Sequence, residues 1–364
     1  EEVDIQNIST LGGSLDMRAN YRLRKFLAGG SSLSEAHFAD GGALEEVDYP
    51  ATTSYVELKN LDKLTNEKCN TEACAPNVMS YFVSGCDNLQ PVKKLIDIMD
   101  AQVGQVPHAL RYVRCVGFNE TFTDGRTFDK LSQLVDGTYQ GIDAEGQYGN
   151  DPYPVLDGTI NLTTGAYRDT YDALMQHYPK LKLNIAKWWI RFEDPEVKRI
   201  CVENWDKDGD GELSMEEAAA VSSIGTKFRN NSNITNLNDF QHFHNVRQLN
   251  EAFAYCTSLL EVRFWEGLES LGDNCIGYCK SVRFIDFPST IKSLGQMFLR
   301  YPIDKNKGVV ICRAKTPPNV SSYNTNIKAL ALYVPDESLE LYRADNNMKK
   351  YISKNIRPLS EYHS

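Results

Sequence analysis

Acidic side chains occur at alternate positions in the stretch NWDKDGDGELSMEEA, residues 204–218. A hard cation such as calcium takes six to eight oxygen ligands, and alternate residues of a tight turn direct their oxygens to one point. With Asp206 at position 1, the spacing of carboxylates, glycine and hydroxyl fits a calcium loop. The predicted cofactor is calcium, and its predicted ligands are Asp206, Asp208, Asp210, Glu212 through its carbonyl, Ser214 and Glu217.

Helix signals flank this loop on both sides. Asp194 followed by Pro195 predicts the start of a helix that leads into the loop. Ser214 and Glu217 have the spacing of a capping box, which predicts a second helix after it. Residues 194–222 therefore resemble a single EF-hand-type helix–loop–helix, and an acidic turn that only caps a helix is the alternative. Because the chain has one such loop, we expect a structural calcium with a dissociation constant on the order of 0.1 to 1 mM.

The composition allows several domains and argues against nucleic-acid binding. The chain has 364 residues, 41% of them hydrophobic, which is enough for real cores. Its formal net charge is −10, whereas phosphate recognition needs an excess of Lys and Arg. No apolar run is long enough to span a bilayer. The sequence begins EEVDIQN without Met, so we expect that a signal segment has been trimmed.

The chain has nine cysteines, an odd number that cannot all pair within one molecule. Cys69 and Cys74 lie in a loop-like stretch, and a local disulfide between them stays open at this point. Cys275 and Cys279 could be two zinc ligands, but the site would need two more. We favour buried thiols that act as small hydrophobic residues.

A repeat follows the acidic loop. The segment AFAYCTSLLEVRFWEGLESLG, from Ala252, aligns position by position with CIGYCKSVRFIDFPSTIKSLG, from Cys275, at an offset of 23. A third copy begins at FLRYP, where Tyr301 follows Tyr278 by the same offset. A fixed period in this range predicts a solenoid whose equivalent apolar residues stack in rows along its axis. The equivalent pairs are Tyr255 and Tyr278, Cys256 and Cys279, Leu259 and Val282, Val262 and Ile285, Phe264 and Phe287, Leu268 and Ile291, and Leu271 and Leu294.

These two segments resemble the leucine-rich repeat of BspA-like surface proteins of gut bacteria. The endings VVICRAKTPP and ALYVPDESLELYRADNNMKKY resemble the terminal strand and cap of that family, so we assign residues 223–364 to it. The resemblance implies a secreted or cell-surface interaction protein without a catalytic centre, and a lipid anchor is one way in which it could be attached. The chain departs from the family in having few full repeats and in having Pro302 where the repeated cysteine would stand.

The first part of the chain, residues 1–155, has the same character with less regular spacing. Equivalent apolar residues recur at an offset of 21, which fits irregular leucine-rich-repeat units. The stretch QPVKKLIDIMDAQ, residues 90–102, interrupts them and predicts a helix. The equivalent pairs are Leu23 and Leu44, Phe26 and Val47, and Val135 and Leu156.

Residues 156–193 read as a β-α-β unit that joins the two repeat regions in an α/β fold. The strand LDGTINL, the helix AYRDTYDALMQHYP and the strand KLKLNIAKWWIRF follow one another, which predicts a parallel crossover. Alternation along the last strand places Trp189 with Lys187 and Arg191 on one face. An aromatic ring between two cations could bind a sugar or a peptide, although packing under a neighbouring element is the favoured alternative.

The sequence contains none of three widespread catalytic motifs. It has no G-x-S-x-G, no phosphate-binding G-x-x-x-x-G-K-[ST] and no H-E-x-x-H. Asp143 and Glu145 could serve glycoside hydrolysis, but solvated loop charge is the favoured explanation. We therefore expect a non-catalytic recognition or adhesion protein with an unknown protein or glycan ligand. A phage virion-associated structural or host-recognition protein is one alternative, and a surface glycan-processing enzyme is another.

Overall fold

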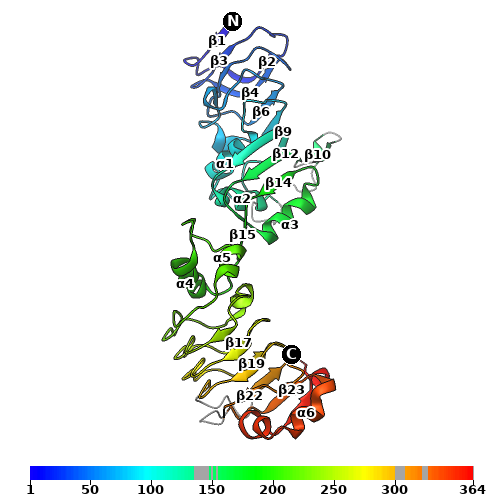
Figure 1. Ribbon diagram of the computed structural model, residues 1–364. Helices are drawn as coiled ribbons and strands as arrows, with labels where there is room; N and C mark the ends of the chain where they lie inside the picture. Colours follow the sequence, from blue (N-terminus) through cyan, green and yellow to red (C-terminus); the bar gives the residue numbers. More distant parts are fainter. Residues whose placement is uncertain (135–146, 149–150, 153–154, 300–307, 322–326, 364) are drawn as a thin grey trace. The chain divides into compact units, whose positions relative to one another are not determined.

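The computed structural model of the chain describes residues 1–134, 147–148, 151–152, 155–299, 308–321 and 327–363 (Figure 1). These residues form two compact units, Glu1–Lys187 and Trp188–Ser364. Val135, Asp143 and Glu145, and the third repeat copy at Tyr301 and Pro302, lie outside the described residues.

The first unit is built on a parallel sheet of seven strands in the order β14-β12-β9-β8-β6-β4-β2. Alternation explains the strands: in β6, Val56 and Leu58 are buried, while Tyr55 and Glu57 are partly exposed. The strands are β2 (Gly12–Met17), β4 (Ser32–Phe38), β6 (Tyr55–Lys59), β8 (Ser80–Ser84), β9 (Tyr112–Phe122), β12 (Val155–Leu162) and β14 (Lys182–Ile185).

A second, smaller parallel sheet accompanies the early strands of the first unit. Phe26 pairs with Val47, which confirms the predicted offset of these two residues. Leu23 and Leu44 are both buried, as their equivalence predicts. Each turn of the chain here gives one short strand to this sheet and one longer strand to the other. The short strands are β1 (Glu2–Asp4), β3 (Lys25–Leu27), β5 (Glu46–Asp48) and β7 (Cys69–Asn70).

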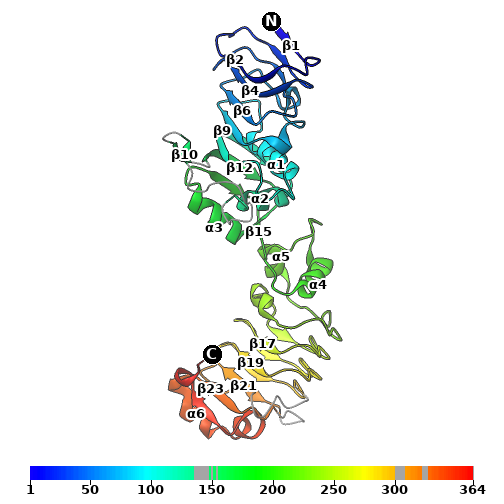
Figure 2. The same cartoon turned by 180° about the vertical axis from the view of Figure 1, so that it is seen from behind.

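Helices replace the short strands in the later part of the first unit. The prediction of a helix over 90–102 is confirmed by α1 (Pro91–Ala101). α2 (Gly125–Ser132) contacts both α1 and α3 (Arg168–His177) (Figure 2). α3 lies in sequence between β12 and β14, and these two strands pair in parallel. Short strands β10 (Gln147–Tyr148), β11 (Asp151–Pro152) and β13 (Ala166–Tyr167) lie in the connections.

A buried carboxylate holds the start of α1. Glu120, on β9, is 2% exposed and accepts the backbone N–H groups of Val92 at 2.7 Å and Lys93 at 3.0 Å. These groups have no partner within the helix, so the side chain acts as a cap from a distant strand. Burial raises the pKa of Glu120 to about 7, although the two amides and Lys93 act to lower it.

The Glu120 pKa predicts a pH-dependent stability of the first unit. The folded pKa of about 7 lies above the ordinary value of 4.5. The stabilisation is therefore fully present below the unfolded pKa and is lost as pH rises through 7, on the order of 3 kcal/mol in all. We expect Glu120→Gln to remove this dependence. Urea unfolding of both proteins at several pH values from about 4.5 to about 8 measures it, and parallel pH profiles would contradict the assignment.

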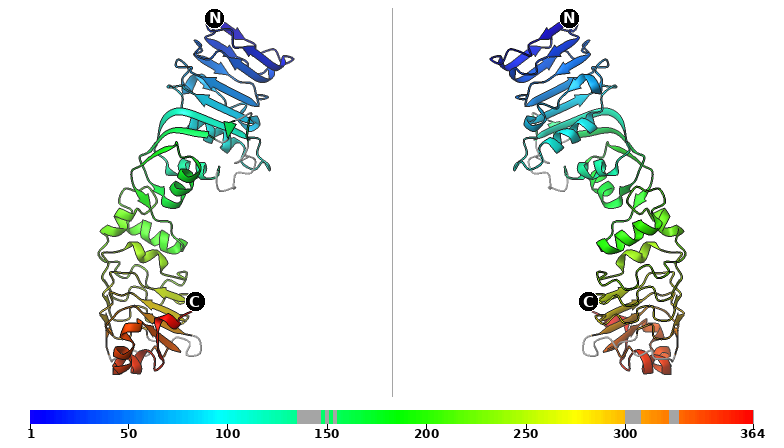
Figure 3. Two further views of the ribbon diagram at one scale, coloured as in Figure 1. Left: turned by 90° about the vertical axis from the view of Figure 1, so that its right-hand side faces the viewer. Right: turned by 90° about the vertical axis from the view of Figure 1, so that its left-hand side faces the viewer.

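The second unit contains two parallel sheets, whose strands are stacked in Figure 3. Val262 pairs with Ile285 and Leu271 pairs with Leu294, which confirms the predicted repeat offset. One sheet holds β16 (Gln248–Leu249), β18 (Ser270–Leu271), β20 (Ser293–Leu294) and β22 (Asn319–Val320). The other holds β17 (Glu261–Arg263), β19 (Phe284–Phe287), β21 (Val309–Cys312), β23 (Ala331–Val334) and β24 (Ile356–Pro358).

Equivalent side chains of the second unit stack as the repeat predicts. The Phe264 and Phe287 rings lie 5.9 Å apart and are inclined by 2°. The Cys256 thiol donates to the Phe228 carbonyl, and the Cys279 thiol donates to the Phe253 carbonyl, both at 3.1 Å. Matching contacts in successive repeats mean that each turn of the chain is built on the one before it. The unit also holds α4 (Pro195–Trp205), α5 (Met215–Ala220) and α6 (Leu339–Ala344).

Candidate metal loop and its surroundings

The loop between α4 and α5 begins at a well-capped helix. The Asp194 carboxylate accepts the amides of Glu196 at 2.9 Å and Val197 at 3.3 Å, which confirms the predicted cap. α4 ends at Trp205, and the next residue, Asp206, is its C-cap. The end of α4 therefore places Asp206, the first predicted ligand, at the start of the loop.

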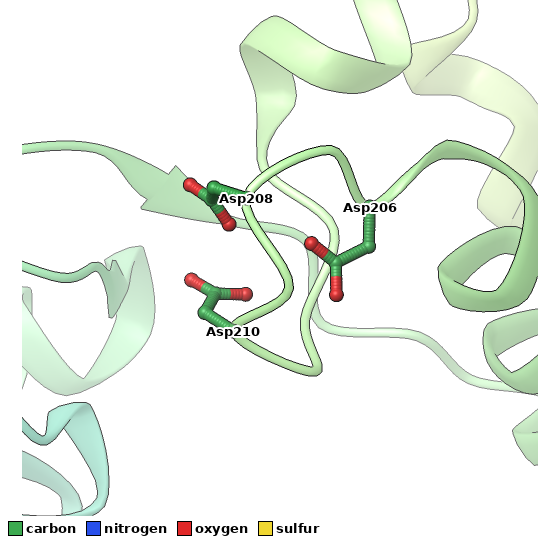
Figure 4. Close-up of side chains that lie close together, drawn as sticks. All are labelled: Asp206, Asp208 and Asp210. Atoms are coloured by element: carbon green, nitrogen blue, oxygen red, sulfur yellow. The ribbon is translucent and has the colours of Figure 1, made fainter.

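Three carboxylates converge inside this loop (Figure 4). Ligand oxygens of Asp206, Asp208 and Asp210 lie within 4.8 Å of one another. In the described part of the chain, no other group of three or more His, Cys, Asp or Glu side chains is placed closely enough to share an ion. Gly209 and Gly211 have φ values of 74° and 82°, so glycine is needed at both positions for the chain to bend around the carboxylates.

Backbone amides fix two of these carboxylates. Asp206 accepts the Gly209 amide at 2.7 Å and the Gly211 amide at 2.9 Å, one on each oxygen. Asp210 accepts the Glu212 amide on Oδ1 at 2.9 Å. The loop thus holds its carboxylates in place through its own N–H groups, which also offset part of their mutual repulsion.

The second helix returns a fourth carboxylate to the loop. Ser214 and Glu217 form the predicted capping box at the start of α5. Glu217 accepts the Lys207 amide on Oε1 at 2.8 Å and the Ser214 amide on Oε2 at 2.9 Å. One side chain therefore bridges the two ends of the loop. The Glu212 side chain instead pairs with Lys198 at 2.7 Å, which leaves its carbonyl as its contribution to a metal.

The donors gathered by the loop fit calcium better than a transition metal. They are carboxylate, hydroxyl and carbonyl oxygens, without nitrogen or sulfur, and hard cations prefer such ligands. The three converging carboxylates also suit a divalent cation. Asp206, Asp208 and Asp210, whose oxygens already lie together, would hold the ion. Glu217 is not part of that close group, and it, Glu212 and Ser214 are the further oxygen ligands that the sequence predicts.

The predicted face of Trp189 with Lys187 and Arg191 does not form. β14 ends at Ile185, and β15 (Trp188–Trp189) is a separate short strand, so alternation does not continue through the stretch. Trp189 is 6% exposed and Ile190 is 1% exposed, although alternation would place them on opposite faces. The segment departs from the expected strand pattern, and Trp189 forms an isolated bridge with Ser214 of the loop of residues 206–217, which is called the metal loop below. The Trp189 ring is therefore not a surface on which a sugar could stack.

A buried aspartate that sequence analysis missed ties the loop region to the repeats. Asp239, in the short 3₁₀-helix Asn238–His242, is 3% exposed and accepts the amides of Glu193 at 2.8 Å and Asp194 at 3.1 Å. Asp194 in turn accepts the Thr235 amide at 3.0 Å. Burial raises the pKa of Asp239, while the two amides oppose this shift. The sequence around it, Leu237-Asn238-Asp239-Phe240, gave no clear signal that this carboxylate is buried.

All nine cysteines are buried free thiols. The disulfide left open for Cys69 and Cys74 is thus not formed. Burial raises the pKa of Cys256 to about 11 and that of Cys279 to about 12, so neither is a thiolate at neutral pH.

The burial of these two cysteines predicts slow alkylation of their thiols in the folded protein. We expect Cys256 and Cys279 to react with a bulky alkylating agent only after the protein unfolds, because the thiolate is the reactive form and both are hidden. Mass spectrometry of native and urea-unfolded samples measures the labelling. Fast native labelling of both, or a disulfide between them, would contradict the stacked arrangement.

A row of left-handed residues runs along one edge of the repeats. Asn230, Tyr255 and Tyr278 have φ values of 60°, 66° and 65°. The Asn230 amide donates to the Ala254 carbonyl and the Tyr255 amide donates to the Gly277 carbonyl, so the three positions are equivalent. Asn tolerates this backbone region, whereas a bulky residue there is an outlier. The backbone alone therefore does not account for tyrosine at the last two positions.

The two tyrosines form a partly exposed aromatic stack. Their ring centroids lie 4.3 Å apart with an angle of 6°. The Arg229 guanidinium lies 5.8 Å from the centroid of Tyr255, which is 38% exposed. The repeat alignment makes these tyrosines equivalent, but the strained backbone and the neighbouring cation could not be read from the sequence. Tyrosine and arginine are among the residue types most enriched in binding hot spots.

Comparison with known proteins finds one match, which lies over the repeat. Residues 213–302 match the family model of the BspA type leucine rich repeat region, given as six copies. No curated protein matches the chain. The match begins within the metal loop and extends over β16 to β20, where the repeat offset is found. Among the helices that the structure describes, none has the length and apolarity needed to cross a membrane.

Proposed function

We propose that the chain is a non-catalytic recognition or adhesion protein, secreted or held at a cell surface, with one structural calcium. The observation that carries the proposal is the stack of parallel strands in residues 248–358, together with the repeat match. Leucine-rich repeats of this type are protein-interaction modules and are typical of surface and adhesion proteins. Stacked repeats present a continuous surface on which a partner can contact several turns at once.

The aromatic stack of Tyr255 and Tyr278 is the surface we assign to partner contact. Its rings, with Arg229 beside them, combine apolar area, hydroxyl groups and positive charge. Such amphipathic side chains lose little conformational entropy on binding and supply much of the energy of many interfaces. The nearby Glu251, paired with Arg229, adds an acceptor to the same edge.

A hydrolytic function has less support from the described residues. A cleft of about 610 Å³ lies between β7 and α1, and acidic residues line it. Two of them are engaged in ion pairs: Asp97 with Lys93 at 3.1 Å, and Asp100 with Lys130. This arrangement does not set a general acid against a nucleophile.

Arrays of glycans and of cell-surface proteins test the recognition proposal. We expect reproducible binding of a defined ligand and no turnover of the arrayed glycans. The double variant Tyr255→Ala/Tyr278→Ala should weaken this binding at least about tenfold, as loss of hot-spot residues does. Tyr21→Ala, in the first unit and 62% exposed, is the matched control and should bind as the wild type does. Product release without retained binding would favour an enzyme instead.

A further inference from the structure

A short segment before α4 is attached to the metal loop through both its backbone and a side chain. Trp189 forms an antiparallel bridge with Ser214, and the Ile190 amide donates to the Leu213 carbonyl at 2.9 Å. The Trp189 indole Nε1 donates to Asp210 Oδ2 at 3.0 Å. The segment thus contacts the loop at Asp210, Leu213 and Ser214, and two of these are predicted metal ligands.

We propose that Trp189 is a positioning residue of the calcium site and acts through Asp210. This inference rests on the calcium binding proposed above. Asp210 accepts the Glu212 amide on Oδ1 and the indole N–H on Oδ2, so a separate donor holds each oxygen. A carboxylate oxygen has two lone pairs, so it can accept a hydrogen bond and still coordinate a cation. The two donors therefore fix the plane of the carboxylate before the ion arrives.

The burial of Trp189 makes this hydrogen bond more effective. The side chain is 6% exposed, whereas Asp210 itself is an exposed residue of the loop. An exposed carboxylate without a fixed donor samples several rotamers, and metal binding would then have to restrict it. The indole comes from a packed position and cannot move away, which lowers that entropic cost.

The same segment also covers the Leu213 side of the loop. Leu213 is 0% exposed, and its carbonyl already has the Ile190 amide as a partner. This edge of the loop is thus covered by residues of the same unit. Calcium affinity should consequently depend on the order of residues 188–190, although they precede the whole of α4 in the sequence.

Titration of the full chain with calcium and with terbium tests the role of Trp189. Terbium is an oxygen-seeking ion whose emission increases when a nearby indole absorbs light. Trp189→Phe keeps an aromatic ring but removes the N–H donor, and Trp188→Phe is the matched control from the same segment. We expect Trp189→Phe to weaken the binding of calcium and of terbium about tenfold or more, as measured by titration. Trp188→Phe should stay within about twofold of the wild type.

A double-mutant cycle separates positioning from general packing. If Trp189 acts through Asp210, its substitution should have little further effect on terbium affinity in an Asp210→Ala background. Thermal unfolding in a chelator shows whether Trp189→Phe retains the fold. Equal weakening by both tryptophan variants, or an undiminished effect in the Asp210→Ala background, would overturn the inference while leaving the calcium site intact. Absence of binding to the wild-type chain would overturn both.

Discussion

Calcium at a hundredfold excess over its dissociation constant will raise the free energy of unfolding of the second unit by about 2.7 kcal/mol. The expected size follows from mass action, since an ion that binds the folded loop and not the unfolded chain adds its binding free energy to the stability of the fold. The physical cause is local: Asp206, Asp208 and Asp210 place their oxygens within 4.8 Å of one another. Like charges at such distances repel by about 1 kcal/mol or more per pair near a protein surface.

Two substitutions make the calcium prediction specific. Asp206→Ala removes a carboxylate that also accepts two loop amides, and Glu217→Ala removes the side chain that bridges both ends of the loop. Each should abolish the stabilisation. Isothermal titration should give one site per wild-type chain, and magnesium should compete poorly because it demands an octahedral shell. Absence of any heat signal up to several millimolar calcium would mean that the loop is not a calcium site.

Hydrogen exchange distinguishes a structural ion from a switch. We expect slower exchange on calcium addition at α4, the loop and α5, because these residues surround the carboxylates. The strands β17 and β19 should be equally protected with and without calcium, since stacked apolar residues hold them. Newly exposed apolar surface, or ligand binding that appears only with calcium, would mean that the loop regulates function.

The turn of residues 206–217 and the helices on either side of it could be predicted from the sequence because their determinants are local, whereas calcium binding there stays a prediction. The caps Asp194 and Ser214 lie two and three residues from the amides that they accept. The acidic residues and glycines of the loop all lie within residues 206–217. The repeats could be predicted for a different reason: a fixed offset brings equivalent residues together whatever the fold between them. Phe264 and Phe287 stack for this reason.

The parts that could not be predicted depend on contacts between residues that are distant in sequence and are not related by the repeat offset. Trp189 meets Asp210 only because β14 ends early, and alternation gave no sign of that end. Asp239 reaches the amides before α4 from beyond both α4 and α5. Glu120 caps α1 in the same way, from a strand that follows the helix. In each case a single polar side chain forms hydrogen bonds with groups elsewhere in the chain, and the hydrophobic pattern of the sequence does not reveal these contacts.

Replacing Phe240 by alanine will destabilise the second unit by about 3 to 5 kcal/mol. Phe240 is 0% exposed, and its ring lies 4.9 Å from Phe228, 5.1 Å from Phe253 and 5.6 Å from Trp265. It therefore packs between the segment after the metal loop and the first repeats, where no neighbour can fill the cavity without breaking a ring contact of its own.

The loss of stability caused by Phe240→Ala should be confined to the second unit. The two units are separate compact units. Urea unfolding followed by hydrogen exchange should therefore show reduced amide protection in the second unit and unchanged protection in α1 and β8 of the first unit. Tyr255→Ala, at a 38% exposed ring of the same unit, is the control and should cost about 1 kcal/mol or less. Because Phe240 belongs to the same short helix as Asp239, whose carboxylate holds the amides before α4, the variant should also weaken calcium binding. A loss below about 1 kcal/mol, or an equal loss in both units, would mean that the aromatic cluster does not organise the join between the metal loop and the repeats.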